Sequence, residues 1–232
     1  MTRLALLLVI SASAGCSGGD DENCPVDTTY APVINPGDFV AAVDNPLFPL
    51  VPGTVTTFEG EGESIEVSVT SDAKVILGVT CTVVRDTVTV GGEVTEDTFD
   101  WFAQDRDGNV WYMGEDTKEY EGGVVVSTEG SWEAGVGGAK PGIVMPAAPA
   151  VGAPYRQEYL ACEAEDHAEI LALDESVTVP AGSYDHCVKT HEFTPLEPAL
   201  NEQKYYCPGV GVALEVNVNT GGRVELMSIT GP

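Results

Sequence analysis

The sequence predicts a mainly β protein: an antiparallel β-sandwich or half-barrel built from two similar meander halves. Three observations predict this class. Short runs rich in Val and Thr alternate apolar and polar residues, as half-buried strands do. The 26 Gly and 15 Pro among 232 residues separate these runs with turns. Outside residues 168–173, which could form one helical turn, no run has the spacing of an amphipathic helix.

The first fifteen residues have the pattern of an export signal. Arg3 precedes the apolar run Leu4–Ile10, and small residues follow this run. The run is too short to cross a bilayer as a permanent helix, and small residues are what signal peptidases accept. Residues 1–15 are therefore predicted to be a signal peptide.

The next residue is a cysteine in a recognisable context. Ser13-Ala14-Gly15-Cys16 resembles the lipobox of bacterial lipoproteins, in which the cysteine receives diacylglycerol, although Leu is usual at the first position. The resemblance implies that Cys16 is lipidated; ordinary secretion with an incidental cysteine is the alternative. We expect residues 16–44 to hold this cysteine and a flexible acidic tether, because residues 17–23, SGGDDEN, include no apolar side chain.

A single β-rich domain is predicted over residues 45–230. Its entry segment, 45–53, holds three prolines and is expected to be extended, because residues before Pro avoid the helical region. Residues 130–153 are rich in Gly, Ala and Pro and poor in charge. We expect a crossover loop there, near 130–153, that divides the domain into halves.

Glycine pairs predict the hairpin turns of this domain. Gly91-Gly92, Gly122-Gly123 and Gly221-Gly222 each stand between two alternating runs. The strands expected from the alternation are 54–58, 65–70, 75–77, 80–90, 93–102, 117–121, 124–129, 155–161, 168–173, 176–179, 187–193, 204–207, 211–218 and 223–229.

A central hairpin is predicted over residues 100–120. Asp107-Gly108 suits a two-residue type I′ loop, since both positions of that turn need a positive φ. Alternation along its strands places aromatic residues on both faces, so we expect the hairpin to be covered on both sides. Either these aromatics face a ligand or they fill the core. They are Trp101, Phe102, Trp111 and Tyr112.

The two halves also resemble each other. Residues 77–85 and 182–190 each hold a cysteine in a Val-containing strand. An aromatic-rich hairpin follows each of them, over residues 100–114 and 204–215. This pattern suggests a weak internal duplication of one meander unit.

The charge balance restricts the partners. The chain has 10 basic and 37 acidic residues, a net charge of −27. Such a surface repels phosphate backbones, so a nucleic acid is excluded as a partner.

Five cysteines remain once Cys16 is assigned to lipid, and an odd number leaves at least one thiol unpaired. Cys81 and Cys187 lie in apolar strands and suit either buried free thiols or a core disulfide. Cys162 and Cys207 lie beside turn-forming residues near strand ends, which favours a disulfide between them. Spacing alone does not determine connectivity.

No catalytic or metal site is expected. Cys187 and His191 share a strand face but lie ~13 Å apart at the usual strand rise, too far for a hydrogen bond. His186 and His191 fall on opposite faces and cannot chelate one ion together. Acidic pairs such as Glu115-Asp116 are available for general acid–base chemistry, but no spacing typical of a serine nucleophile and its partners occurs. We therefore expect no cofactor.

Several stretches between Asn45 and Glu215 resemble an uncharacterised family of bacterial secreted proteins and lipoproteins. These stretches are WFAQD at 101–105, GNVWY at 108–112, GEDT at 114–117 and TPLEP at 194–198, and the closing pattern is VPAG at 179–182, CVK at 187–189 and YYCPGVG at 205–211. In β-rich envelope proteins with that closing pattern, Ala commonly stands at the position of Cys207. The resemblance implies a location and a fold but no catalytic residue, because the family has no assigned reaction. It also makes Cys162 and Cys207 features of this member, which favours their pairing.

Together these features indicate an exported, lipid-anchored lipoprotein of the bacterial cell envelope, at the outer membrane or cell surface. We expect a non-catalytic binding domain, a carrier or sensor of a small apolar ligand, attached to the membrane through its lipid anchor. One alternative is a surface structural module that binds an envelope protein. A carboxylate-dependent hydrolase is a further alternative, and it would need two acids in one cleft with displaced pKa values.

Overall fold

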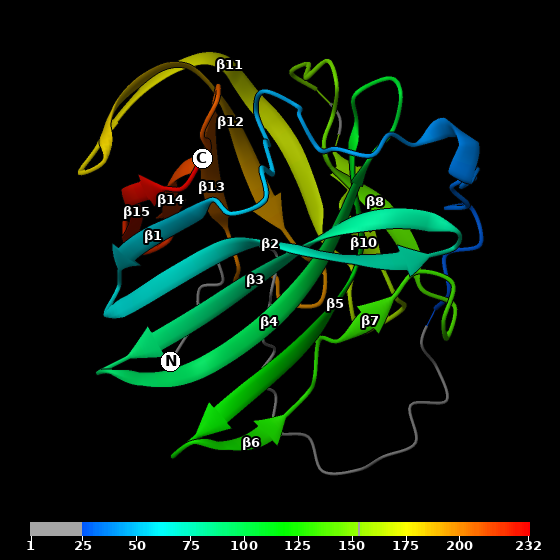
Figure 1. Cartoon of the computed structure of the whole chain (residues 1–232), viewed down its shortest axis with the longest axis horizontal. Helices are drawn as coiled ribbons and strands as arrows, with labels where there is room; N and C mark the ends of the chain where they lie inside the picture. The colour runs from blue at the N-terminus through cyan, green and yellow to red at the C-terminus, as the bar shows by residue number, and fades with distance from the viewer. Residues whose placement is uncertain (1–24, 153) are drawn as a thin grey trace.

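A computed structural model of the chain describes residues 25–152 and 154–232. One antiparallel sheet of 15 strands dominates these residues, and Figure 1 shows it curving into a half-barrel. The strand bounds are β1 Val55–Gly60, β2 Glu63–Ile76, β3 Val79–Val90, β4 Glu93–Gln104, β5 Val110–Glu121, β6 Val124–Ser127, β7 Trp132–Glu133, β8 Lys140–Met145, β9 Tyr155–Arg156, β10 Glu158–Tyr159, β11 His167–Val179, β12 Gly182–Phe193, β13 Glu202–Cys207, β14 Gly211–Asn217 and β15 Arg223–Thr230; a short 3-10 helix, η1, covers Pro36–Asp38.

The strand order confirms a mainly β half-barrel made of two meanders. Strands β1 to β5 are neighbours in sequence order, strands β11 to β15 are neighbours in the same way, and β1 pairs with β15 to join the two sets. Cys81 lies in β3, before the β4–β5 hairpin, and Cys187 lies in β12, before the β13–β14 hairpin. The sandwich alternative is wrong, because the two halves share one continuous sheet.

The two ends of the sheet meet at residues 155–159. β9 pairs with β11 at one end, β10 pairs with β8 at the other, and Gln157 alone separates β9 from β10. The half-barrel is therefore nearly closed, and we call this junction of β8, β9 and β10 the seam. A Cβ atom on Gly142 of β8 would stand 2.3 Å from the Gln157 carbonyl carbon, so the close approach requires glycine.

The crossover loop expected near 130–153 is wrong in part. The segment contains β7 and β8, and β8 pairs with both β5 and β10. Pro141 and Gly142 interrupt the alternation of apolar residues there, which hid the strand from the sequence pattern. Residues 130–145 thus complete one side of the half-barrel.

The turn of the central hairpin is longer than expected. Gln104 pairs with Val110, so the loop comprises residues 105–109 and not two residues. Gly108 alone in this loop has a positive φ, of 97°. The Gly108 amide donates to the Asp105 carbonyl, and the Asp105 carboxylate accepts bonds from the Asn109 amide and the Trp111 indole. These bonds fix a five-residue loop where the dipeptide pattern predicted a shorter one.

The expected tether over residues 16–44 also needs correction. Residues 1–24, which include the expected signal peptide and Cys16, lie outside the described residues. The part that is described packs against the domain: Phe39 forms a bridge with Asp105, Val43 is buried, and the Asp27 amide donates to the Tyr159 hydroxyl. Both apolar residues, such as Phe39 and Val43, and polar bonds of Asp27 provide this contact, so residues 25–44 are not a free tether.

Cys207 forms its disulfide with Cys187, on the neighbouring strand β12. The expected Cys162–Cys207 pair is therefore wrong. The pairing follows from register, because Val188 is the partner of Tyr206 and this brings the two adjacent cysteines together. Cys162 is itself disulfide-bonded, and Cys81 is a buried free thiol. Within the described part of the chain, no helix is both long and apolar enough to span a membrane.

Candidate functional site

Acidic side chains line the inner face of the half-barrel. Residues directly opposite each other in an antiparallel pair lie on the same face, and the register sets Asp86 opposite Thr98 and Asp100 opposite Glu115. All four side chains are buried. The interior acid cluster, each member at most 5% exposed, comprises Asp86, Glu96, Asp100, Glu115, Glu158, Asp166, Glu192, Glu202 and Glu215.

This cluster joins both walls of the half-barrel. Asp86 on β3 interacts electrostatically with Lys204 on β13, although five strand positions separate these strands in the sheet. Glu115 on β5 interacts in the same way with Glu158 on β10. The walls therefore face each other closely enough for their charges to be coupled.

Lys204 is a buried cation within this cluster. Its Nζ lies 3.1 Å from Glu192 Oε2 and 3.5 Å from Glu215 Oε2. Glu192 also accepts hydrogen bonds from the Tyr206 hydroxyl, at 2.8 Å, and from the Thr190 hydroxyl, at 3.0 Å. Lys204 on β13 thus links the neighbouring strands β12 and β14 through the carboxylates of Glu192 and Glu215.

Hydroxyl groups donate hydrogen bonds to some of the other carboxyl groups. The Tyr112 hydroxyl donates to Asp100 Oδ1 at 2.6 Å, and the Thr117 hydroxyl donates to Glu115 Oε2 at 2.8 Å. These bonds restrain the carboxyl groups of β4 and β5 without neutralising them.

Burial raises the pKa of most members of the cluster, and nearby carboxyls add to the effect. The pKa of Asp100 and that of Asp166 each rise to about 8, and that of Glu202 rises to about 7. Burial is also the main cause of the raised pKa values of four further members, which lie well above their usual range: Asp86, Glu115, Glu158 and Glu215. At neutral pH much of the interior is therefore protonated.

Several buried polar atoms have no hydrogen-bond partner, which is uncommon in folded proteins. Both carboxyl oxygens of Asp86 lack one, and so do both amide atoms of the fully buried Gln157. Glu215 likewise accepts no hydrogen bond, but Lys204 is close to it. Asp86 is thus a buried acid with neither a hydrogen bond nor a close cation among the described side chains.

An apolar pocket adjoins the acids. It has a volume of about 70 Å³ and lies between the entry segment 45–53, β1, β2 and β14. We call it the Phe58 pocket; it is lined by Phe48, Pro49, Leu50, Thr54, Thr56, Phe58, Val67, Val69, Val210, Gly211 and Val212. Val67 lines the pocket and is the direct partner of Asp86 on the adjacent strand β3. The Asp86 side chain is therefore the neighbour of a pocket residue on the same face of the sheet.

None of the four aromatics of the central hairpin lines this pocket: Trp101, Phe102 and Tyr112 lie in the core, and Trp111 packs against it. Phe102 and Tyr112 stack with ring centroids 4.9 Å apart, and Phe48 packs on Phe102 at 5.2 Å. Trp101 has the Lys74 ammonium 3.2 Å from its ring centroid, and Trp111 packs edge-on against Phe39. Of these seven side chains, Phe48 alone lines the pocket.

The histidines do not form a metal site. His167 and His191 each stack on the ring of Phe193, with centroids 5.6 and 5.0 Å away, and His186 is exposed beside Asp174. No group of three or more metal-ligating side chains has suitable geometry in residues 25–152 and 154–232. Cys187 is bonded to Cys207 and offers no thiol to a histidine.

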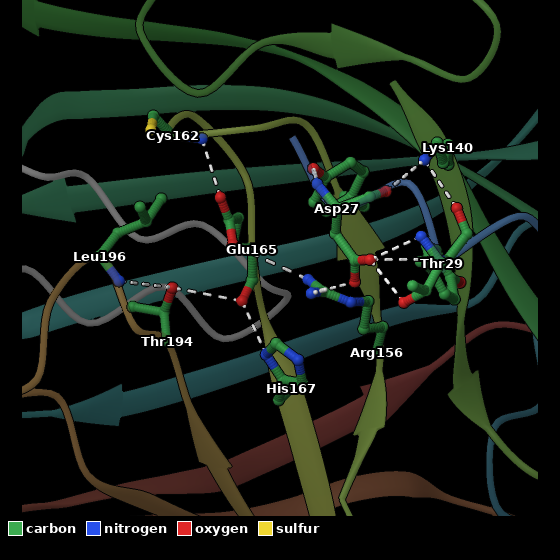
Figure 2. A network of polar contacts seen from close by, with 11 residues as sticks. Asp27, Thr29, Lys140, Arg156, Cys162, Glu165, His167, Thr194 and Leu196 are labelled. Atoms are coloured by element: carbon green, nitrogen blue, oxygen red, sulfur yellow. Dashed lines mark hydrogen bonds and ion pairs between the residues drawn. The ribbon is translucent and has the colours of Figure 1, made fainter. Parts of the chain in front are cut away.

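A polar network covers the seam from outside. Figure 2 shows Arg156 of β9 between Asp27 and Glu165, with guanidinium nitrogens 3.0 and 3.8 Å from their carboxylates. Lys140 of β8 donates to the backbone carbonyls of Asp27 and Tyr30. We call residues 27–30 the strap, because they contact all three seam strands.

Comparisons with known proteins give little further identification. No protein-family model matches this chain, and no curated protein matches it. A structure described as an exported protein with YmcC-like fold from Bacteroides fragilis is similar, with a TM-score of 0.45 and 15% identity, over 79% of this chain and 98% of that one. A structure described as a lipoprotein from Parabacteroides distasonis has a TM-score of 0.38 and 13% identity, over 80% and 99% of the two chains. Neither likeness assigns an activity, and the family resemblance of the residue stretches stays a prediction.

Sequence reasoning missed the acid cluster because it treated acids as surface residues. Glu96, Thr98 and Asp100 alternate with Asp97 and Phe99, and nothing in that pattern tells which face is enclosed. One signal was present: outward-facing aromatics at alternate positions along β4 indicate a strand covered on both faces.

Proposed function

We propose that this chain is an exported envelope protein, anchored by lipid on Cys16, whose half-barrel binds a small ligand in its interior. The apolar run at 4–10 and the lipobox-like stretch ending at Cys16 support export and anchoring. The half-barrel itself supports binding, since its curved inner face carries a pocket and polar groups with unused bonding capacity.

The Phe58 pocket is the observation that carries the proposal. Engineered apolar cavities of about 150 Å³ bind benzene, so a cavity of about 70 Å³ suits a smaller group such as the end of an alkyl chain. The buried rings of Phe48 and Phe58 and the side chains of Val67 and Val69 provide apolar walls. A ligand held there is a small molecule with an apolar end.

Catalysis is less well supported than binding. Asp100 and Glu115 are opposed acids with raised pKa values, which meets one requirement of a carboxylate-dependent hydrolase. The second requirement is a cleft that brings a substrate to both acids. The Phe58 pocket is lined by no acid.

Two measurements test the proposal. Native mass spectrometry of the lipidated protein from envelope membranes, before and after denaturation, should show a small mass that leaves on unfolding. In NMR titrations with n-hexanol, the methyl signals of Val67 and Val69 should shift. Val69→Phe should abolish the response by filling the pocket, whereas Val125→Phe on the exposed strand β6 should not. No adduct together with unmoved methyl signals would reject the binding function.

One observation favours the second candidate, a surface interaction module. β6 pairs with β5 alone, and Val124, Val125 and Val126 are exposed along this edge. Exposed apolar edge strands pair readily with another chain. If a second copy pairs there, sedimentation will show a dimer that Val125→Lys dissociates.

A further inference from the structure

Asp86 differs from the other interior acids in what surrounds its carboxyl group. Tyr112 donates to Asp100, Thr117 donates to Glu115, and Lys204 lies beside Glu192 and Glu215. Asp86 is 3% exposed, and neither of its oxygens has a hydrogen-bond partner. A buried carboxyl group of this kind is costly for the folded state unless something pairs with it.

The titratable groups that face Asp86 are mostly acids. Asp100, Glu96 and Asp97 all act on it as negative groups, and Lys204 is the positive group that opposes them. A cation that enters next to these acids stabilises their ionised forms, whereas a neutral or anionic group does not. A metal ion is not suggested, since the described residues do not provide three ligands in a suitable geometry.

The position of Asp86 relative to the Phe58 pocket limits the shape of such a cation. Val67 lines the pocket and is the direct partner of Asp86 on the adjacent strand. Opposed side chains in an antiparallel pair have Cβ atoms roughly 5 Å apart. A ligand whose alkyl end fills the pocket therefore brings its next few atoms to the carboxyl group.

We propose that the ligand of this half-barrel is an aliphatic amine, whose alkyl chain occupies the Phe58 pocket and whose ammonium group pairs with Asp86. This inference rests on the proposed binding function and specifies its ligand class. The ammonium group supplies hydrogen-bond donors to both Asp86 oxygens, and its positive charge stabilises the ionised form of this carboxyl group.

Three six-carbon probes test the inference on the unaltered protein. n-Hexylamine, n-hexanol and hexanoate carry the same chain with a positive, neutral or negative head group. Titration followed by the Val67 and Val69 methyl signals should give at least ten-fold tighter binding for the amine than for the alcohol, and no measurable binding for hexanoate. Equal affinities for amine and alcohol would reject the amine proposal and leave the binding function intact. Unmoved methyl signals with all three probes would reject both.

A pair of variants identifies the carboxyl group. Asp86→Asn keeps the shape of the side chain and should remove the advantage of hexylamine while hexanol binding persists. Asp72→Asn makes the same charge change at an exposed position of β2 and should leave the ten-fold preference unchanged. If Asp86→Asn retains the preference, Asp86 is not the partner of the ammonium group. Hexanol binding by Asp86→Asn also reports that the variant is folded.

Discussion

Lys204 and Glu192 form a buried ion pair across adjacent strands, with 3.1 Å between Nζ and Oε2. Removing one partner of such a pair leaves the other charge buried without compensation, which typically destabilises a protein by ~3–5 kcal/mol. Because Lys204 also faces Glu215, its removal affects two acids at once.

Lys204→Met should therefore lower the free energy of unfolding by about 3–5 kcal/mol at neutral pH. Urea denaturation followed by tryptophan fluorescence measures the change. Lys189→Met provides the matched control, because Lys189 lies on neighbouring β12 and its Nζ lies over the ring of Tyr205. We expect the control to lose less than about 1 kcal/mol. A loss of similar size in both variants would contradict the role of the buried pair.

Stability should be greatest in mild acid. The pKa values of Asp100, Asp166 and Glu202 are higher in the folded protein than their ordinary values, so the folded state binds these protons more tightly than the unfolded chain does. Their contribution is complete below the unfolded pKa of about 4 and is lost as the pH rises through about 7 to 8. The urea midpoint should therefore fall steadily between pH 5 and pH 9, about the range where these groups titrate.

Net charge alone also predicts weaker folding at high pH, so the pH experiment needs a matched pair of variants. Glu158→Gln and Glu129→Gln remove one acid each, the first inside the half-barrel and the second on the exposed surface. The interior variant should flatten the pH dependence, because the pKa of Glu158 is raised well above its usual range. Equal slopes in the two variants would show that surface repulsion, and not the interior acids, causes the effect.

The seam should be intolerant of even a methyl group. Gly142→Ala places a Cβ atom 2.3 Å from the Gln157 carbonyl carbon and 2.6 Å from the Arg156 carbonyl oxygen, so the backbones must separate. We expect a loss of about 1–3 kcal/mol, as for other overpacked sites. Gly37→Ala meets its nearest atom at 3.6 Å and should change stability by less than about 0.5 kcal/mol. Thermal unfolding measures the stability of both variants. An equal loss in the two would show that the added methyl group acts independently of the close approach at the seam.

The Cys187–Cys207 disulfide is open to direct chemical proof. Peptide mapping without reduction should yield one peptide pair that links these cysteines, and none that links Cys162 to Cys207. The cysteines are 20 residues apart, a separation for which loop closure predicts about 3 kcal/mol of stabilisation. The double variant Cys187→Ala/Cys207→Ala should lose that amount, and retention of full stability would contradict it.

The strands with strict alternation and glycine turns were predictable from sequence. The pairs Gly91-Gly92 and Gly122-Gly123 have positive φ at every position, as two-residue hairpins need, and the strands on both sides pair as expected. The central hairpin at 100–120 was also found, and its residues are buried on both faces over 100–104 and 112–115. These features depend on neighbours in sequence, so local pattern suffices to predict them.

The closing of the half-barrel, the disulfide pairing and the acids of the interior were not predictable from local sequence pattern. β8 became a strand through its partners β5 and β10, which come from distant parts of the chain. The Cys187–Cys207 pair depends on the register of β12 against β13, which spacing cannot give. The interior acids depend on the direction in which the sheet curves, and alternation alone does not distinguish an enclosed face from an exposed one.

The strap has a mechanical consequence. From one short segment, its contacts with Tyr159, Lys140 and Arg156 hold all three strands of the seam. The contacts of Arg156 with the rings of Tyr30 and Tyr159, at 5.4 and 4.8 Å, add to the same attachment. Release of the strap would therefore loosen the seam before it disturbs the hairpins of either meander.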